Sequence, residues 1–246
     1  MNVDVITLFP ELVDFPLSES IIGRARKEKI LKLKFANPRD FTEDKHRTVD
    51  DRPYGGGTGM LMKAEPVCRA LEKVRKKNSY VILLTPKGKR FNQKTAIELS
   101  KKKRLVFICG HYEGIDERIT PLTDIQLSIG DYVLTGGEPA AVVVIDAITR
   151  LIPGVLKKGD ATVNETFTDG LMEAPQYTRP AVWRGNSVPE ELLSGNHEKI
   201  AEWRRSKAEE LTKASESGMA DLSGKDKVKE SDKNRKTVLK HRRKAV

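Results

Sequence analysis

The sequence contains few of the residues that build metal centres and disulfide frameworks. Only two of its 246 residues are cysteine and four are histidine. Cys68 and Cys109 lie 41 positions apart with no CxxC pair, and the histidines do not have the spacing of metal ligands. We therefore expect two buried, reduced thiols and no structural metal site.

Long apolar runs are also missing. No stretch approaches the roughly 18 apolar residues of a membrane-spanning helix. The first residues, MNVDVITLFPEL, lack the basic region that precedes the apolar part of a secretory signal. With 38% hydrophobic and 33% charged residues, the composition is that of a soluble globular protein. We expect a cytoplasmic protein with no membrane partner, folded as one large or two small domains.

Acidic residues are outnumbered, mainly at one end of the chain. The formal net charge is +10, and residues 225–246 contain ten Lys or Arg but only three Asp or Glu, so +7 of that charge lies in this tail. The tail has almost no apolar residues with which to form a core. It is predicted to be a solvated, disordered extension that can contact RNA phosphates without sequence preference.

The first 150 residues alternate short apolar runs with amphipathic segments. This pattern predicts an α/β fold, a parallel sheet with helices on both faces. Nearly continuous apolar runs indicate buried parallel strands, and an alternating run indicates an edge strand. The expected strands are 3–9, 80–85, 105–110 and, at the edge, 30–35; the expected helices are 64–77, 92–103 with Asn92 as N-cap, and an almost wholly apolar 139–150.

The character of the sequence changes after Arg150. The next segment has neither helical nor strand periodicity and is rich in Gly, Thr, Asp and Lys, which is typical of a linker. Residues 188–213 then predict a helical region, interrupted at Ser194-Gly195-Asn196. The expected organisation is an α/β domain (1–156), a flexible linker (157–172), a small helical C-terminal domain (173–224) and the basic tail (225–246).

Three glycine-containing segments follow or flank the predicted strands, at 85–88, 110–118 and 128–139. Ligands of open α/β sheets bind at the carboxyl ends of the strands. Glycine there lets backbone groups reach a ligand. A single such segment is more often an ordinary turn, but three at one sheet edge predict a small-molecule pocket.

A fourth glycine-rich segment, DDRPYGGGTGM at 50–60, fits neither the dinucleotide fingerprint nor the phosphate-loop pattern. By itself it indicates either a flexible turn or a backbone that something approaches closely.

Several motifs together resemble the bacterial tRNA (guanine-N1)-methyltransferase family, in order from about residue 1 to residue 205. They are HRTVDDRPYGGGTGMLM (46–62), CGHYEGIDER (109–118), SIGDYVLTGGE (128–138), IPGVL (152–156), YTRP (177–180) and VPEELLSGNHEKI (188–200). The resemblance implies a trefoil-knotted methyltransferase that uses S-adenosylmethionine and methylates N1 of the guanine 3′ of the tRNA anticodon. It also implies a homodimer with the active site at the subunit interface.

The resemblance assigns the methyl donor to the glycine segments. His111 stands where the family commonly has Arg, and GGEPAA replaces GGELPA, which moves the proline to Pro139; we expect altered affinity rather than lost binding. The implied donor-binding residues are Leu84, Thr85, Pro86, Gly110, Tyr112, Glu113, Gly114, Ser128, Ile129, Gly130, Tyr132, Leu134, Gly136 and Gly137.

The same resemblance places the target guanine against the glycine-rich run. A flipped base needs a flat slot and polar groups at its Watson–Crick edge. Asp50 is the implied acceptor for that edge; the alternative is a cap or an ion pair with Arg47 or Arg52. The slot residues are Gly55, Gly56, Gly57 and Gly59.

Methylation at N1 requires a base that removes the N1 proton and a cation that stabilises the charge on O6. Arg150 matches the family's arginine; without the resemblance it reads as an exposed arginine at a helix end. The family's acidic position falls on Glu165, and Asp169 is the alternative base. Both acids are otherwise explained as solubilising residues of a linker.

The departures at GGEPAA and in the tail leave two other functions open. One is a noncatalytic RNA-binding protein of the same fold. The other is a related methyltransferase that acts on another RNA.

Overall fold

The computed structural model describes residues 1–156 and 171–225, with side chains as far as residue 214. The chain divides into two compact units, Met1–Thr162 and Val163–Val246. The division falls inside the segment 157–172 that the sequence predicts as a linker. Most of that linker and the predicted tail lie outside the described residues.

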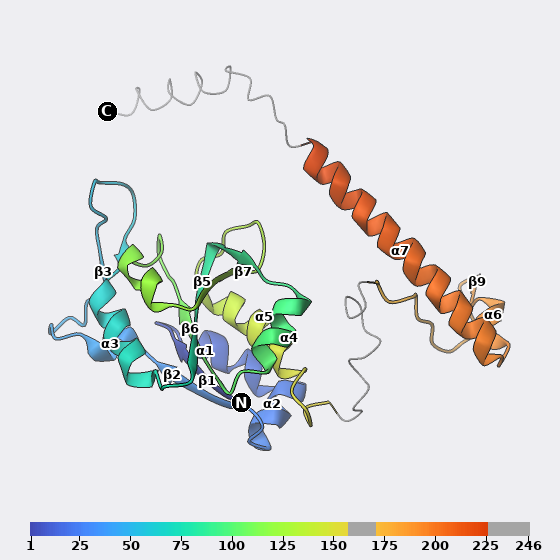
Figure 1. Ribbon diagram of the computed structural model, residues 1–246, viewed down its shortest axis with the longest axis horizontal. Coiled ribbons are helices and arrows are strands. Elements are labelled where there is room, and N and C mark those ends of the chain that lie inside the picture. Colours follow the sequence, from blue (N-terminus) through green and yellow to red (C-terminus); the bar gives the residue numbers. More distant parts are fainter. Residues whose placement is uncertain (157–170, 226–246) are drawn as a thin grey trace. The chain divides into compact units, whose positions relative to one another are not determined.

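The N-terminal unit is built on five parallel strands in the order β2-β1-β6-β5-β7 (Figure 1). Every pairing in this sheet is parallel, which confirms the predicted α/β class. The lysine-rich β2 pairs only with β1, so the alternating run is an edge strand as predicted. The strands are β1 (Asn2–Ile6), β2 (Lys32–Ala36), β5 (Ser79–Arg90), β6 (Arg104–Cys109) and β7 (Ile125–Ser128).

The continuous apolar runs form strands that are buried on both faces. In β6, Leu105, Phe107 and Cys109 belong to one core cluster, whereas Val106 and Ile108 belong to the other. Successive side chains of a strand point to opposite faces, so a strand between two helical layers must be apolar at every position. This is why the run predicts a central strand.

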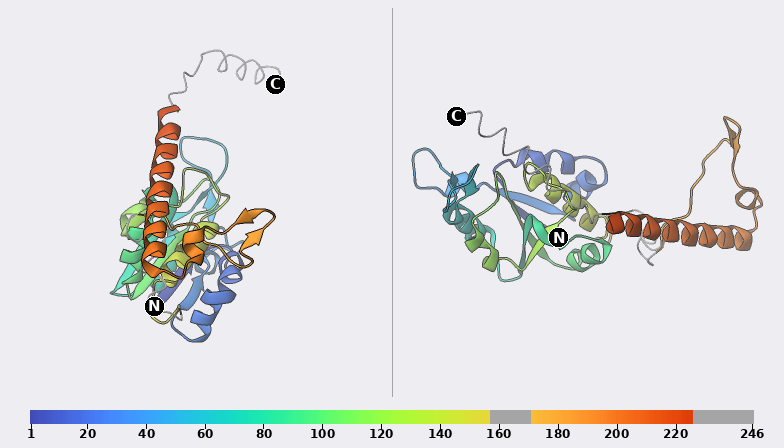
Figure 2. Two further views of the ribbon diagram at one scale, coloured as in Figure 1. Left: turned by 90° about the vertical axis from the view of Figure 1, so that its right-hand side faces the viewer. Right: turned by 90° about the horizontal axis from the view of Figure 1, so that it is seen from above.

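Helices cover both faces of the sheet. One core cluster contains residues of α1 (Glu11–Asp14), α2 (Ser20–Lys27), α4 (Gln93–Ser100) and α5 (Glu138–Thr149). The other contains residues of α3 (Ala64–Val74) and the 3-10 helix η3 (Glu117–Leu122). Figure 2 shows α1 and α2 (blue) beside α5 (yellow-green). Two further 3-10 helices are η1 (Pro16–Ser18) and η2 (Pro38–Phe41).

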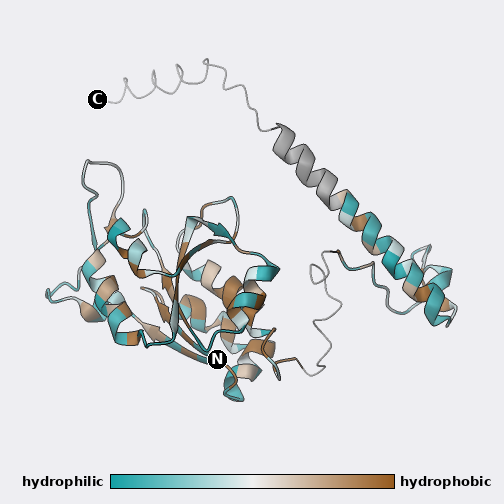
Figure 3. Ribbon diagram, in the orientation of Figure 1, coloured by the Kyte–Doolittle hydropathy of each residue, from teal (hydrophilic) through white to brown (hydrophobic). Residues whose placement is uncertain are grey.

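The helix predicted to be buried has that position. Residues of α5 such as Ala141, Val144 and Ile145 are fully buried, and Figure 3 shows hydrophobic residues along this helix. The predicted cap of α4 is confirmed as well, because Asn92 Oδ1 accepts a hydrogen bond of 3.0 Å from the backbone N–H of Thr95.

The segment 85–88 is not the loop that the sequence predicts. Strand β5 continues through it to Arg90, with a register shift between Leu84 and Lys89 opposite β7. Gly88 is required for this path, because a Cβ there would lie 2.5 Å from the backbone nitrogen of Leu127. The register shift explains the misleading pattern, since an irregular stretch inside a strand has the composition of a turn.

The two cysteines differ in environment. Both are free thiols, but only Cys109 is buried, and Cys68 on α3 is half-buried, so the expected burial is wrong for Cys68. The Cys68 thiol faces Glu72, with 3.7 Å between Sγ and Oε1. Burial, with a smaller effect from the charge of Glu138, raises the pKa of Cys109 well above its usual value.

The described residues of the C-terminal unit form a two-stranded hairpin and two helices. The hairpin pairs β8 (Val182–Trp183) with β9 (Asn186–Ser187), and α6 (Glu190–Leu193) precedes α7 (His197–Lys225). The break between the helices falls where the sequence predicts it, at Ser194-Gly195-Asn196. Asn196 caps α7 by accepting hydrogen bonds from the backbone N–H groups of Glu198 and Lys199.

Candidate functional site

Two of the predicted loops meet at the carboxyl end of the sheet. We call residues 110–118 and 129–137, which follow β6 and β7, the strand-end loops. The backbone N–H of Gly137 donates to the carbonyl of Gly110 at 2.7 Å, and His111 forms an antiparallel bridge with Gly136. Leu84 of β5 pairs with Cys109 of β6 and Leu127 of β7, between these loops. The structure therefore brings segments far apart in sequence to one edge.

The glycines at this contact serve backbone packing. A Cβ on Gly137 would lie 2.8 Å from Cys109 Cα and 3.0 Å from the backbone nitrogen of Gly110. A Cβ on Gly136 would lie 2.6 Å from Nδ1 of His111. The start of α5 can approach the end of β6 only because both positions lack a side chain. This physical reason is separate from the ligand access that the sequence suggests.

The second strand-end loop folds partly on itself and exposes apolar side chains. The Ser128 hydroxyl donates to the carbonyl of Gly130 at 2.9 Å, and the Tyr132 hydroxyl lies 3.4 Å from the carbonyl of Ile129. Tyr132, Val133 and Leu134 are all exposed, Val133 by 85%. Exposed apolar side chains beside a glycine backbone form a surface suited to a flat, partly apolar ligand.

The first strand-end loop joins the glycine-rich run. His111 and Gly114 close a turn through a 3.1 Å hydrogen bond from Gly114 N–H to the His111 carbonyl, with Tyr112 at φ +59°. The N–H of Glu113 then donates to the carbonyl of Met60 at 3.0 Å. The last residue of the glycine-rich run is thus held against the loop that follows β6.

The glycines of the run itself adopt backbone conformations that favour glycine. All four have positive φ, from +80° to +131°. A Cβ at Gly55 or Gly56 would meet nothing within 4 Å, whereas one at Gly59 would lie 2.4 Å from Cγ of Glu113. In Figure 1 the segment between β3 (Asp50–Asp51) and β4 (Leu61–Met62) projects from the unit. Three of the glycines therefore shape a turn, and only Gly59 permits a close contact within the chain.

Asp50 and Asp116 differ in how strongly neighbouring groups hold them. Asp50 in β3 is half-buried, and no ion pair to it is found within the part of the chain that the structure describes. The alternative pairing with Arg47 is not present, since Arg47 pairs with Asp40. Hydrogen bonds from Arg118 lower the pKa of Asp116. Asp116 is therefore a poor proton acceptor, whereas the carboxylate oxygens of Asp50 can accept hydrogen bonds from another group.

Of the two predicted catalytic residues, Arg150 lies within the described part of the chain. Arg150 is half-buried at the C-cap of α5, where its backbone N–H donates to the Asp146 carbonyl at 3.2 Å. Glu165 and Asp169 both lie outside the described residues. Arg150 thus stands at the end of the helix whose start forms the contact between the strand-end loops.

Sequence reasoning missed a buried polar cluster beside these loops. Thr7 and Glu138 are both fully buried, and the Thr7 hydroxyl donates to Glu138 Oε1 at 2.6 Å. The other carboxylate oxygen, Oε2, lies 3.7 Å from Nδ1 of His111. A polar residue inside the apolar run VDVITLF, and a glutamate at the start of an apolar helix, were the available signals.

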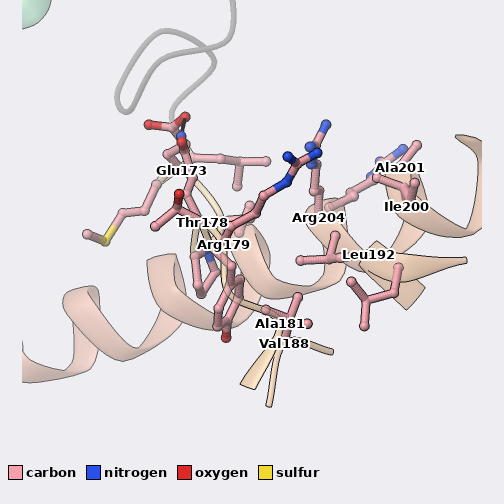
Figure 4. Close-up of a pocket in the computed structure, with 18 residues that line it drawn as sticks. Glu173, Thr178, Arg179, Ala181, Val188, Leu192, Ile200, Ala201 and Arg204 are labelled. Carbon is pink, nitrogen blue, oxygen red and sulfur yellow. Dashed lines mark hydrogen bonds between the residues drawn. The ribbon is translucent and has the colours of Figure 1, made fainter. Parts of the chain in front are cut away.

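A cavity of about 1130 Å³ lies in the C-terminal unit (Figure 4). Its walls combine apolar side chains such as Leu192 and Ile200 with the guanidinium groups of Arg179 and Arg204. Neither arginine has an ion-pair partner among the residues that the structure describes. Unpaired guanidinium groups in a partly apolar hollow favour an anionic ligand.

Two searches of the described residues were negative. Among the residues whose side chains the structure describes, 1–156 and 171–214, no group of three or more His, Cys, Asp or Glu side chains could hold a metal ion. In the same ranges, no helix has the length and apolar character needed to cross a membrane.

Comparison with known proteins decides the family. Residues 1–222 match the family described as tRNA (Guanine-1)-methyltransferase TrmD. The chain belongs to this family. Proteins named tRNA (guanine-N(1)-)-methyltransferase are 55% identical over 206 residues in Carboxydothermus hydrogenoformans and 51% identical over 234 residues in Clostridium botulinum (strain Kyoto / Type A2). The first match covers 83% of this chain and 81% of the relative, and the second covers 95% and 96%.

A third relative, from Caldanaerobacter subterraneus, has the same name and is 55% identical over 213 residues, covering 86% of this chain and 88% of its own. The family of methyltransferases implied by the motifs is thus confirmed.

Proposed function

We propose that this protein methylates N1 of the guanine immediately 3′ of the tRNA anticodon, with S-adenosylmethionine as methyl donor. The observation that carries the proposal is the joining of the strand-end loops to the glycine-rich run, through Gly137 to Gly110 and Glu113 to Met60. A donor site and a base slot must be adjacent for direct transfer of a methyl group. These contacts connect the two candidate sites.

The loops fit the donor. The exposed side chains of Tyr132 and Leu134 lie on the second of these loops and can cover an adenine ring. When bound, S-adenosylmethionine supplies an electrophilic methyl group. The residues proposed to hold it are Leu84, Thr85, Pro86, Gly110, Tyr112, Glu113, Gly114, Ser128, Ile129, Gly130, Tyr132, Leu134, Gly136 and Gly137.

The chain's own residues manage the proton and the charge. Glu165 accepts the proton that N1 loses as the methyl group passes from sulfur to N1. Electron density moves toward O6, where the guanidinium of Arg150 stabilises it. Asp50 accepts a hydrogen bond from the Watson–Crick edge of guanine, in the slot formed by Gly55, Gly56, Gly57 and Gly59.

The function is tested by mapping the methylated base. The purified protein is incubated with donor and a tRNA transcript that has guanine after the anticodon, and the product is digested and analysed by mass spectrometry. We expect one methyl group, on N1 of that guanine. A transcript with adenine at that position is the control and should remain unmodified. Donor binding without transfer would indicate a noncatalytic RNA-binding protein, and transfer to ribosomal RNA or another tRNA position would indicate a different methyltransferase.

The C-terminal unit is proposed to contribute to tRNA binding. At the hairpin tip, Trp183 is 59% exposed and the guanidinium carbon of Arg184 lies 4.7 Å from its ring centroid. An exposed aromatic ring beside an arginine is a platform on which an unpaired base can stack. Arg179 and Arg204, which line the cavity, add positive charge in the same unit.

Removing this stacking platform should weaken tRNA binding and leave donor binding unchanged. Trp183→Ala is expected to raise the tRNA Kd about tenfold, because stacking contributes about 1–3 kcal/mol per base. Arg184→Gln should reduce the slope of log K against log salt by about one. Both are measured by fluorescence anisotropy over a salt series. Donor Kd, determined by calorimetry, serves as the control, and a change there would argue against a role confined to RNA.

We further propose that the protein is a homodimer whose active site lies at the subunit interface. Several large apolar side chains are exposed near the end of β1 and on the helices of one sheet face: Phe9, Leu12, Phe15, Ile21 and Val143. Phe15 is 76% exposed. Such a patch is typical of an interaction surface. A second copy of the chain is the occupant that the shared site requires.

A charge in this patch should separate the subunits. Phe15→Glu is expected to raise the dimer Kd by about thirtyfold, because burying a phenylalanine stabilises an interface by about 2 kcal/mol. Analytical ultracentrifugation over a concentration series measures the change. Leu193→Glu is the control, since Leu193 is also exposed but lies on α6 in the other unit. Equal effects of both substitutions would contradict the assignment of the interface.

A further inference from the structure

Glu138 has an unusual environment for a carboxylate. The residue is fully buried at the first position of α5, and only one of its two oxygens, Oε1, receives a hydrogen bond, from Thr7. The other, Oε2, has no hydrogen-bond partner in the described part of the chain. The same holds for Nδ1 of His111, 3.7 Å away. Two buried polar atoms that lack partners thus face each other.

The chemistry of this pair fixes the proton on the imidazole. A buried carboxylate with a single donor is costly, and an unprotonated Nδ1 would direct a lone pair at it. Hydrogen on Nδ1 relieves both costs, and it makes His111 a donor toward Glu138.

We propose that Thr7, His111 and Glu138 form a positioning cluster that holds the two strand-end loops in the geometry that binds the methyl donor. The proposal rests on the proposed function, and it concerns residues that do not touch the reacting atoms. Each of the three comes from a different segment: Thr7 follows β1, His111 follows β6, and Glu138 begins α5. A contact among them therefore ties three strand and helix ends together.

The cluster lies where a shift would be transmitted to both loops. His111 is flanked by Gly110, which accepts the 2.7 Å hydrogen bond from Gly137, and by Tyr112. The rings of Phe9 and Tyr112 pack on the imidazole, at centroid distances of 4.8 Å and 5.1 Å. Movement of the His111 ring would thus displace one loop directly and the other through the bridge to Gly136.

A displacement of His111 would also reach the proposed base slot. The turn closed by His111 and Gly114 places Glu113, which donates to Met60 and lies against Gly59. The contact between Nδ1 and Oε2 is longer than a hydrogen bond, which is about 2.7–3.2 Å. The contact is therefore able to shorten. Closure of the loops on the donor shortens it, so that donor binding and this contact strengthen each other.

The experiment compares two substitutions of His111 by amide side chains. Each amide places its N–H group near a different nitrogen of the histidine ring. Asparagine at position 111 places its amide near the Nδ1 position, whereas glutamine places it near Nε2. We expect His111→Asn to keep the donor Kd within about threefold of the wild-type value. His111→Gln should raise it about tenfold, the scale of one hydrogen bond to a charged group. Isothermal titration with S-adenosylmethionine measures both, and His46→Leu, an exposed histidine of the same unit, is the control.

Kinetics and a double variant separate positioning from general stability. The KM for donor should rise with His111→Gln while kcat at saturating donor falls less than threefold. His111→Leu alone leaves Glu138 with only the hydrogen bond from Thr7, and adding Glu138→Leu removes the buried carboxylate whose second oxygen lacks a donor. The double variant should therefore bind donor more tightly than His111→Leu.

Three results would overturn the proposal: equal donor Kd values for the Asn and Gln variants, a fall in kcat with unchanged KM, or strictly additive effects in the double variant. Failure of the wild-type protein to bind the donor would instead reject the proposed function itself. If His111→Leu does not fold, the comparison of Asn with Gln still decides.

Discussion

Replacing Glu165 with glutamine is expected to slow methyl transfer by about a hundredfold or more, the usual scale for loss of a general base. Guanine N1 carries a proton that must leave as the methyl group arrives. Glutamine has nearly the size of glutamate but cannot accept that proton. The rate is measured in single turnovers at saturating donor and tRNA, which removes binding and product release from the comparison.

Asp169→Asn is the matched control, because it neutralises the other candidate acid of the same segment. It should change the single-turnover rate by less than threefold. The reverse pattern would move the base to Asp169. A loss for neither variant would leave both acids as solubilising residues and assign proton removal elsewhere. Donor Kd should be unchanged in both variants.

Gly88→Ala is expected to lower the free energy of unfolding of the N-terminal unit by about 3 kcal/mol, the upper part of the range for overpacking a closely packed site. The new Cβ would lie 2.5 Å from the backbone nitrogen of Leu127 and 2.6 Å from the carbonyl carbon of Gln126. Backbone atoms of a paired strand cannot rotate away as a side chain can. The pairing of β5 with β7 should therefore weaken.

Gly56→Ala is the matched control for the glycine-to-alanine change. Gly56 has φ +80° and a Cβ there would meet nothing within 4 Å, so only backbone strain of about 1–2 kcal/mol is added. Urea unfolding followed by circular dichroism measures both variants. Hydrogen exchange of the β7 peptide locates the change, because both tryptophans, Trp183 and Trp203, report on the other unit. Equal losses would show that β5 and β7 can separate without cost.

Residues near the sheet were well predicted because a central strand allows few patterns. Apolar runs at 80–85 and 105–110 gave buried strands, the alternating run gave the edge strand, and Asn92 gave a helix cap. Helix ends were less accurate: the helix predicted at 64–77 ends at Val74, and that at 92–103 ends at Ser100. Helical periodicity continues into residues that no longer pack, so it does not mark an end.

The candidate site was predicted in part. Segments 110–118 and 128–139 were expected to meet because the carboxyl ends of parallel strands share one edge. The contact of Glu113 with Met60, which connects the glycine-rich run, has no sequence signal, since hydrogen bonds between backbone groups do not depend on residue type. The individual roles of the site residues remain predictions.

The sequence by itself determined the class of the fold, its family, and the position of the strand-end loops. These follow from local periodicity and from motifs that are contiguous in the chain. Only the tertiary structure decided that Gly88, Gly136 and Gly137 are needed for packing, and that Thr7 and Glu138 meet beside His111. Thr7 and Glu138 are 131 positions apart. No local pattern encodes such a contact, because the sheet and α5 must first bring the two segments together before their side chains can interact.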